Sequence, residues 1–271
     1  MFICTDQLER IVKLEQYPPK RIISLVPSQT ELLHDLGLDK EVIGITKFCV
    51  HPRRWFQTKE RVGGTKTVNI EKVNRLQPDL VIANKEENVR DQIEQIKQIA
   101  PVWISDVNNF NDALKMIQSV GELVNKKEKA STLISQIETN FLKLQTSDFK
   151  PPTCYLIWRN PYMTIGGDTF IGDMLRRCGL KNIFENKSRY PEITIEEISE
   201  RGAAIILLSS EPFPFKQKHA AEIQSQLPGA KILFADGEMF SWYGSRMLYA
   251  AQYFSELMNK IHTLDSNQFF A

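Results

Sequence analysis

The sequence lacks the features that mark membrane-spanning, nucleic-acid-binding and disulfide-rich proteins. Within its 271 residues, no apolar run approaches the roughly 20 residues that a membrane-spanning helix needs. The formal net charge is only +1, so the basic surplus required for binding phosphates is missing and no nucleic-acid partner is expected. The four cysteines are scattered without a CxxC pair, which argues against a structural zinc site or a disulfide framework.

Recognisable catalytic motifs are also missing. The sequence contains no GxSxG, no HExxH and no cluster of histidines with carboxylates, which an enzyme would need as a convergent set of reactive groups. Asp168 and Asp236 are more simply explained as turn or helix-cap residues than as catalytic groups. These absences favour a binding protein over an enzyme.

The N-terminus lacks the apolar segment of a secretory signal peptide. The first twenty residues, MFICTDQLERIVKLEQYPPK, carry charges from the start. Two alternatives follow: the chain stays in the cytoplasm, or a signal was removed or lies upstream of the Met shown.

What the sequence does contain is two blocks of alternating strand and helix patterns. Short β-branched runs predict buried strands, and amphipathic stretches between them predict the helices of a parallel α/β sheet. The sequence Lys150-Pro151-Pro152 breaks the chain before the second block. We therefore expect an N-terminal α/β lobe over residues 1–109 and a C-terminal α/β lobe over residues 150–271. The expected strands are 21–26, 42–46, 79–83 and 101–105, then 153–158, 204–209 and 231–235.

Residues 110–149 are expected to link the two lobes. The stretch 110–145 has no proline and a single glycine, and apolar residues such as Ile117, Leu133 and Ile137 recur at helical spacing. Its second half alone would span roughly 30 Å, about the width of a small domain. The pattern predicts one long backbone α-helix between two Rossmann-like lobes; an ordinary long surface helix is the alternative.

Aromatic and basic side chains gather where the expected strands end. Open α/β sheets bind their ligands in loops at the carboxyl ends of the strands. A role in the core is the alternative for Phe48 and Trp55, and a plain loop role is the alternative for His51. The candidate ligand-binding residues are Phe48, His51 and Trp55 in the first lobe and Trp158, Arg159, Tyr162, Trp242, Tyr243 and Arg246 in the second.

The two expected lobes also contain similar segments, each with a glutamate at the matching position. Glu71 follows Asn69, and Glu196 follows Thr194, so each glutamate falls in the first turn of a helix with a capping residue. The two segments align without a gap through the following strands. The simple explanation is that each carboxylate complements a helix dipole. The alternative is a pair of matched acidic knobs, one on each lobe.

Several stretches in one order resemble a known family. They are PKRIISLVPSQTELLHDLGL, VGGTKTVNIEKVNRLQPDLVIA, the long helical stretch, and GGDTFIGDMLRRCGLKNIF. Together they resemble the substrate-binding proteins of ABC importers for vitamin B12 and iron chelates, the helical-backbone metal receptors. The resemblance implies a class III periplasmic-binding-protein-like fold: two α/β lobes, one backbone helix and a ligand held between the lobes.

The same resemblance implies what this protein does and where. It implies no catalysis, no resident cofactor or metal, and an ABC-importer permease as the partner of a protein in the periplasm or at the cell surface. In the vitamin B12 binder, one glutamate on each lobe docks onto the permease, and the matching positions here are Glu71 and Glu196. A monomer is the default expectation.

The ligand expected from the resemblance is a metal chelate, with cobalamin or a related corrinoid first. A corrinoid is a broad, mostly apolar disc fringed with amides, which suits aromatic walls. A ferric siderophore carries negative charge and would prefer several arginines. Haem is a further alternative, with His51, Tyr162 or Tyr243 as an axial ligand. The alternative from another class is a cytosolic enzyme that handles a corrinoid or another tetrapyrrole.

Overall fold

Two compact units make up the chain. The computed structural model describes residues 1–144 and 150–266, so residues 145–149 of the expected link and residues 267–271 of the expected C-terminal lobe lie outside the described residues. Unit 1 consists of Met1–Val107, Asn111–Ile137 and Trp242–Arg246. Unit 2 contains Asn108–Phe110, Glu138–Ser241 and the chain from Met247 onward. The short segment Trp242–Arg246, which the sequence assigned to the C-terminal lobe, therefore belongs to unit 1.

Unit 1 is built on a parallel sheet, as the β-branched runs predicted. Its strand order is β5-β4-β3-β6-β7, and every neighbouring pair in it is parallel. The central strands consist almost entirely of buried residues, as expected when helices cover both faces of a sheet. The strands are β3 (Ile22–Ser24), β4 (Val42–Ile45), β5 (Glu60–Arg61), β6 (Leu80–Asn84) and β7 (Val102–Ser105).

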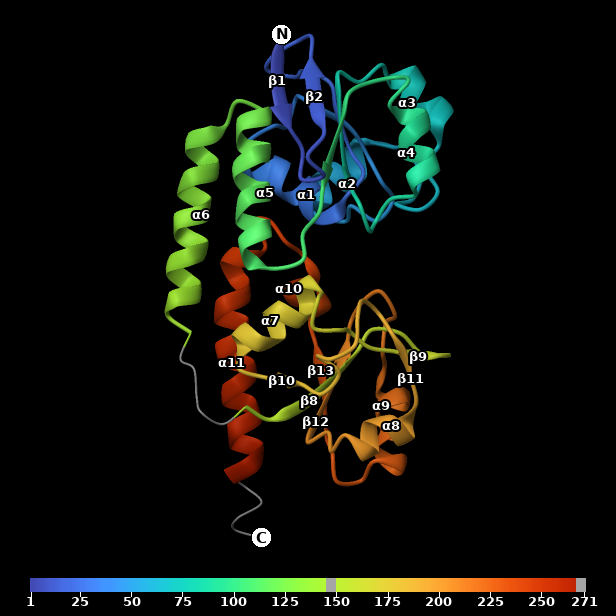
Figure 1. Cartoon of the computed structure of the whole chain (residues 1–271), viewed down its shortest axis with the longest axis vertical. Helices are drawn as coiled ribbons and strands as arrows, with labels where there is room; N and C mark the ends of the chain where they lie inside the picture. Colours follow the sequence, from blue (N-terminus) through green and yellow to red (C-terminus); the bar gives the residue numbers. More distant parts are fainter. Residues whose placement is uncertain (145–149, 267–271) are drawn as a thin grey trace. The chain divides into compact units, whose positions relative to one another are not determined.

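Short helices connect these strands. The helices α3 and α4 cover one face of the sheet, where Val73, Ile93 and Ile96 pack against the strands (Figure 1). The amphipathic stretch 86–100 is helical only from Arg90 to Ile96, and before it the Asn84 side chain accepts hydrogen bonds from the N–H groups of Glu86 and Glu87 and forms a turn. The helices are α1 (Pro27–Asp35), α2 (Arg53–Thr58), α3 (Ile70–Leu76) and α4 (Arg90–Ile96).

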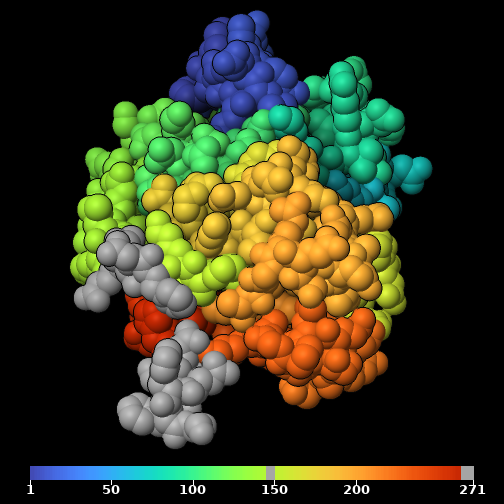
Figure 2. All heavy atoms as spheres, turned by 60° about the horizontal axis from the view of Figure 1, so that its bottom comes forward, coloured from blue at the N-terminus to red at the C-terminus, as the bar shows by residue number. Residues whose placement is uncertain are grey.

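An antiparallel hairpin that the sequence analysis did not predict precedes this sheet. Strands β1 (Phe2–Thr5) and β2 (Ile11–Leu14) pair with each other, and we call them the N-terminal hairpin. Figure 2 shows the hairpin, in blue, standing out from the rest of unit 1. The Gln7 N–H donates to the Ile104 carbonyl at 3.1 Å, so the turn of the hairpin is tied to β7.

The expected single linking helix is wrong: the structure has two helices, α5 (Phe110–Leu123) and α6 (Lys127–Leu142). Asn125 has a φ of 55° between them, a left-handed conformation that Asn tolerates better than most residues. The Lys126 N–H donates to the Gly121 carbonyl and the Asn125 N–H to the Glu122 carbonyl, the bonding pattern of a Schellman motif that ends a helix. Helical periodicity continues across this break, which is why the pattern alone predicted one helix.

The two helices of this pair approach each other closely. A Cβ atom built on Gly121 would lie 2.3 Å from the Cβ of Ala130, which is far inside the contact distance of two carbon atoms. The structure thus needs glycine at position 121 and a small residue at position 130. Most of α6, up to Ile137, packs in unit 1.

Unit 2 repeats the parallel design with fewer strands. Its main sheet has the order β10-β8-β12-β13, and all its neighbouring pairs are parallel. A separate pair, β9 with β11, is antiparallel. The α/β fold class expected from the sequence is confirmed in both units. The strands are β8 (Pro152–Leu156), β9 (Tyr162–Met163), β10 (Lys181–Asn182), β11 (Glu192–Ile193), β12 (Ile205–Ser209) and β13 (Lys231–Ala235).

Helices cover both faces of the unit 2 sheet (Figure 1). On one face, Ile198 of α8 and Ile223 of α9 pack against Cys154, Leu156 and neighbouring buried residues. On the other face lie α7, α10 and α11, which contact one another. The segment between β13 and α11 contains the short helix α10. The helices are α7 (Phe170–Cys178), α8 (Ile195–Glu200), α9 (Gln217–Gln226), α10 (Gly237–Ser241) and α11 (Met247–Ser266).

The contact between Gly121 and Ala130 makes a direct prediction about stability. Gly121→Ala places a methyl group where Ala130 already lies, so we expect a loss of about 1–3 kcal/mol in the free energy of unfolding, despite the better helix propensity of alanine. Urea denaturation followed by circular dichroism measures this loss.

The matched control is Gly229→Ala, because a Cβ at Gly229 meets no atom within 4 Å and the backbone there is not left-handed. Adding Ala130→Gly to Gly121→Ala should restore part of the loss. An unchanged midpoint for Gly121→Ala would contradict the close packing.

Candidate functional site

The carboxyl ends of the unit 1 strands place several polar side chains at one edge of the sheet. Because β3, β4 and β6 run parallel, the segments that follow them meet at the same edge. Glu31 comes from α1 after β3, His51 from the loop after β4, and Glu87 from the loop after β6.

The segment Trp242–Arg246 lies against this edge, and we call it the strap. Arg246 donates to Glu31 through Nε at 2.9 Å and through Nη2 at 2.6 Å, which makes a two-pronged ion pair. The Tyr243 hydroxyl donates to Glu87 Oε1 at 2.9 Å. The rings of Trp242 and His51 meet edge to face, 5.4 Å apart. The structure therefore brings four of the predicted site residues together within unit 1: His51, Trp242, Tyr243 and Arg246.

Only glycine fits the turn inside the strap. Gly244 has a φ of 132°, and a Cβ there would lie 3.2 Å from the Ser28 carbonyl oxygen. This close approach to α1 places Arg246 beside Glu31 and Tyr243 beside the loop after β6.

The ion pair between Glu31 and Arg246 is largely withdrawn from water. The side chains are 15% and 13% exposed. Burial raises the pKa of Glu31, and the hydrogen bond and charge of Arg246 oppose that change. The Arg246 guanidinium also lies over the Trp242 ring, 5.1 Å from its centre. Arg246 is thus held between a carboxylate and an aromatic face.

The start of α1 carries buried polar atoms without a hydrogen-bond partner. They are Ser28 Oγ and Gln29 Oε1, and Ser245 Oγ of the strap shares this property. Ser28 stands three residues before Glu31, which is the spacing of a capping box, but α1 begins at Pro27 without a side-chain cap and Glu31 bonds Arg246 instead.

Phe48 and Trp55 behave differently from each other. Phe48 is 50% exposed in the loop after β4, with Lys47 Nζ 5.1 Å from its ring centre. Trp55 is fully buried in α2, so the alternative of a core role holds for it. Its Nε1 donates to Asp39 at 2.6 Å, and hydrogen bonds from Arg54 and Trp55 lower the pKa of Asp39 to about 2. Trp55 packs unit 1 and presents no ring face to solvent.

Unit 2 holds its candidate residues where β8 ends. Trp158 is 40% exposed, and its ring meets Phe213, which follows β12, edge to face at 5.7 Å. Arg159 Nη2 lies 2.6 Å from both carboxylate oxygens of Glu222 on α9. Tyr162 is half-buried on β9, and its hydroxyl is enclosed beside Arg159. Trp158 and Phe213 form a small aromatic surface beside a neutralised arginine.

The structure adds three residues that the sequence analysis missed: Glu31, Glu87 and Phe213. The two glutamates bond strap residues that are distant in sequence, so no local pattern could identify them. Phe213 does have a local signal, because it follows the predicted strand 204–209 within a Phe-rich stretch.

The two glutamates expected to dock onto a permease occupy equivalent positions. Asn69 caps α3 by accepting from the Lys72 N–H, and Thr194 caps α8 in a capping box with Glu197. Glu71 and Glu196 are therefore the second residue of their helices, and both are exposed. Hydrogen bonds to its own N–H and to Thr194 lower the pKa of Glu196. The local structures around the two carboxylates match, each followed by a buried strand, β6 or β12.

Neither a metal cluster nor a membrane span appears in the described part of the chain. No group of three or more His, Cys, Asp and Glu side chains among these residues could hold a metal ion. No helix within residues 1–144 and 150–266 is both long and apolar enough to cross a bilayer.

The buried ion pair makes the next prediction. Arg246→Met leaves the Glu31 carboxylate buried without its partner, so we expect a loss of about 3 kcal/mol in the free energy of unfolding. Adding Glu31→Gln removes the stranded charge and should recover at least half of this loss in urea denaturation.

Arg54→Met is the control, because its ion pair with Asp39 is exposed and should contribute less than about 1 kcal/mol. Equal losses in the free energy of unfolding for Arg246→Met and Arg54→Met would contradict the prediction that the buried ion pair contributes more than the exposed one.

Comparisons with known proteins agree with this architecture. An uncharacterised ABC transporter substrate-binding lipoprotein of Bacillus subtilis is 31% identical over 191 residues, which cover 66% of this chain and 60% of the lipoprotein, less than two thirds of its length. A vitamin B12-binding protein of Vibrio campbellii is 28% identical over 71% of both chains. The periplasmic haem-binding protein HutB of Vibrio cholerae superposes with a TM-score of 0.77 at 17% identity, covering 88% of this chain and 98% of that one, which shows a shared fold.

These named relatives are binding proteins rather than enzymes, in line with the missing catalytic motifs. The model of the periplasmic binding protein family matches residues 22–232, which is most of the chain. The chain therefore belongs to the periplasmic binding protein family.

Proposed function

We propose that this protein captures cobalamin or a related corrinoid outside the cytoplasmic membrane and delivers it to an ABC importer. The curated relatives named as vitamin B12-binding proteins support a corrinoid, including one from Photorhabdus laumondii whose match covers 89% of this chain. The metal chelate is the cargo, and the proposal includes no resident cofactor and no catalytic step.

The choice of ligand rests on one observation, which is that both candidate arginines are already paired with a glutamate. Arg246 bonds Glu31 through two nitrogens, and Arg159 bonds both oxygens of Glu222. Each positive charge is balanced within its own unit. A catecholate siderophore with several negative charges gains little from such paired arginines, whereas the amide fringe of a corrinoid can hydrogen-bond to them without a charge of its own.

The aromatic residues fit the same ligand class. Phe48 in unit 1 and Trp158 in unit 2 expose 50% and 40% of their surfaces at the ends of strands. Each ring, within its own unit, provides the kind of apolar contact area on which a macrocycle can pack. The three candidate axial ligands for haem are already in use or enclosed: His51 packs on Trp242, the Tyr243 hydroxyl bonds Glu87, and the Tyr162 hydroxyl is buried. These contacts favour a corrinoid over haem.

The proposed partner is the importer's permease, contacted through Glu71 and Glu196. This docking role is supported by two features that the carboxylates share: both are exposed, and both belong to the second residue of a capped helix in their own unit. We expect the protein to act as a monomer. Each of the two exposed carboxylates would then bind one basic site of the permease.

Titration with cyanocobalamin tests the ligand. We expect binding of one equivalent with micromolar or tighter affinity in calorimetry, quenching of tryptophan fluorescence, and recovery of the corrinoid unchanged. Trp158→Ala should weaken the affinity about tenfold, because an aromatic contact contributes about 1.4 kcal/mol. The control is Tyr249→Ala, which removes another exposed aromatic of unit 2 from α11.

Haemin and a ferric catecholate are titrated on the same protein. Tight binding of either one with no binding of cyanocobalamin would overturn the corrinoid assignment and leave the family assignment intact. A corrinoid returned chemically altered would instead indicate the enzyme alternative.

Charge reversal tests the docking role. Glu71→Lys and Glu196→Lys should each weaken binding to the cognate importer in nanodiscs by tenfold or more, since a reversed charge at a basic site is repulsive. Ligand affinity should stay unchanged in both variants. Glu200→Lys, an exposed charge reversal at the other end of α8, is the control and should retain full binding to the importer. Retained importer binding in the double variant Glu71→Lys/Glu196→Lys would remove the two glutamates from the proposal.

A further inference from the structure

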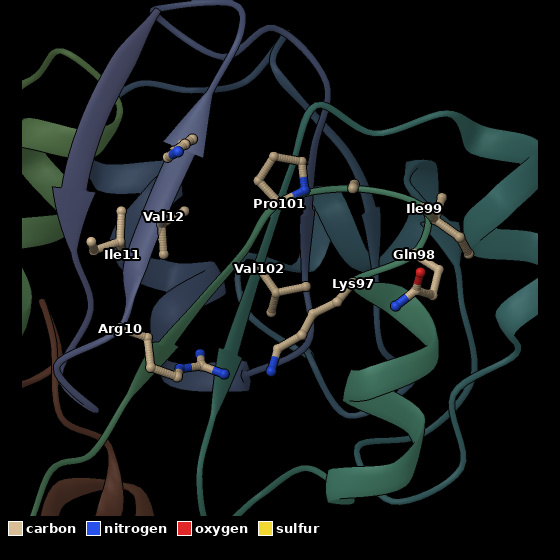
Figure 3. Close-up of a pocket in the computed structure, with 10 residues that line it drawn as sticks. Arg10, Ile11, Val12, Lys97, Gln98, Ile99, Pro101 and Val102 are labelled. Atoms are coloured by element: carbon tan, nitrogen blue, oxygen red, sulfur yellow. The ribbon is translucent and has the colours of Figure 1, made fainter.

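A groove in unit 1 lies outside the candidate ligand site. It has a volume of about 570 Å³ and is lined by Arg10–Lys13 of the N-terminal hairpin and by Lys97–Val102. Figure 3 shows Arg10 and Lys97 reaching into it from opposite walls, toward Val102. Val102 is the first residue of β7, so the groove lies at the amino end of this strand, whereas the candidate ligand loops follow the carboxyl ends. The proposed ligand site therefore does not account for it.

One wall of the groove is an unpaired strand edge. The Asp6 N–H bonds the Arg10 carbonyl, and the register pairs Cys4 with Val12. Hydrogen-bonded and non-bonded pairs alternate in an antiparallel ladder, so the N–H and C=O groups of Ile11 and Lys13 point away from β1. The main-chain groups of Ile11 and Lys13 form no hydrogen bond with any other described residue. The edge of β2 is thus open along the groove.

The facing wall also offers main-chain groups. The Val81 N–H bonds the Pro101 carbonyl, so in the parallel pairing of β6 with β7 the N–H and C=O groups of Val102 face away from β6. Further along β7, the hairpin turn already covers the edge, because Gln7 and Asp6 bond the main chain of Ile104. The open part of the edge is the part that lines the groove.

The groove is basic and partly apolar. Its lining includes three cations and no carboxylate. Asp6 pairs with Arg10 and Glu94 pairs with Lys97 at 2.6 Å, while Lys13 makes no ion pair with any described residue. Ile11 is 70% exposed on the same strand. An exposed apolar strand with an open edge is a template for another strand.

We propose that this groove binds an extended acidic segment of a partner protein, which adds to β2 as a third strand. Main-chain bonds to Ile11 and Lys13 would provide affinity, and acidic side chains beside Lys13 would provide selectivity. A second copy of this chain fits poorly, because antiparallel pairing of β2 with β2, with Ile11 of one copy opposite Lys13 of the other, would place the two Lys13 side chains diagonal to each other on one face. Charge and the open edge together point to an acidic strand.

The probe is a synthetic peptide with alternating glutamate and valine, acetyl-EVEVEVE-amide, added to the whole protein. We expect one-to-one binding, and slower hydrogen exchange at the amides of Ile11 and Lys13 in nuclear magnetic resonance spectra. Lys13→Glu should weaken binding about fivefold or more, as expected for the loss and reversal of an exposed charge pair. Lys40→Glu is the control, because Lys40 is exposed in unit 1 outside the groove.

Four results would overturn the proposal. The first is an absence of binding at millimolar peptide with unchanged exchange at Ile11 and Lys13. The second is equal weakening by Lys13→Glu and Lys40→Glu. The third is the same amide protection by free glutamate or by the lysine peptide acetyl-KVKVKVK-amide, because the groove would then bind small anions or any strand. The fourth is concentration-dependent dimerisation that protects the same amides, which would assign the edge to a second copy instead. Circular dichroism establishes that both variants are folded before binding is compared.

Discussion

The parallel pairing of the strands is the constraint on which the rest of this structure depends. Parallel neighbours cannot be joined by tight turns, so helices must cross over the sheets, and all carboxyl ends collect at one edge of each sheet. In unit 1 this edge gathers Glu31, His51 and Glu87 from three separate segments of the chain. The same rule leaves the amino end of β7 uncovered by ligand loops, which is where the basic groove lies.

Each unit neutralises the positive charge of its own candidate arginine. Glu31 and Glu222 neutralise the two arginines that the sequence offered as ligand-binding groups. Such pairs hold a guanidinium in one orientation and leave its remaining N–H groups for neutral acceptors. In each unit the candidate residues therefore offer amide-bonding groups and aromatic faces more than free positive charge, and the proposed preference for a corrinoid over an anionic iron chelate rests on this difference.

The fold class and most elements were predictable because they follow from local patterns. The β-branched runs predicted the strands β3, β4, β6, β7, β8, β12 and β13, and the capping residues Asn69 and Thr194 begin their helices as expected. The break at Asn125 has a sequence signal, since Asn is the usual substitute for glycine after a helix, but uninterrupted periodicity outweighed it. The N-terminal hairpin was missed because its strands, FICT and IVKL, are half exposed and lack the continuous buried runs that marked the other strands.

For the candidate site, the sequence by itself determined which residue types lie at the strand ends, because the alternation of strand and helix sets where each strand stops. It also determined the matching positions of Glu71 and Glu196, which depend only on local capping. The tertiary structure alone decided that Trp55 is buried, that the strap belongs to unit 1, and that Arg246 is paired with Glu31. Those outcomes depend on contacts between residues far apart in the chain, Glu31 and Arg246 among them, and no local pattern encodes which distant partner a side chain will meet.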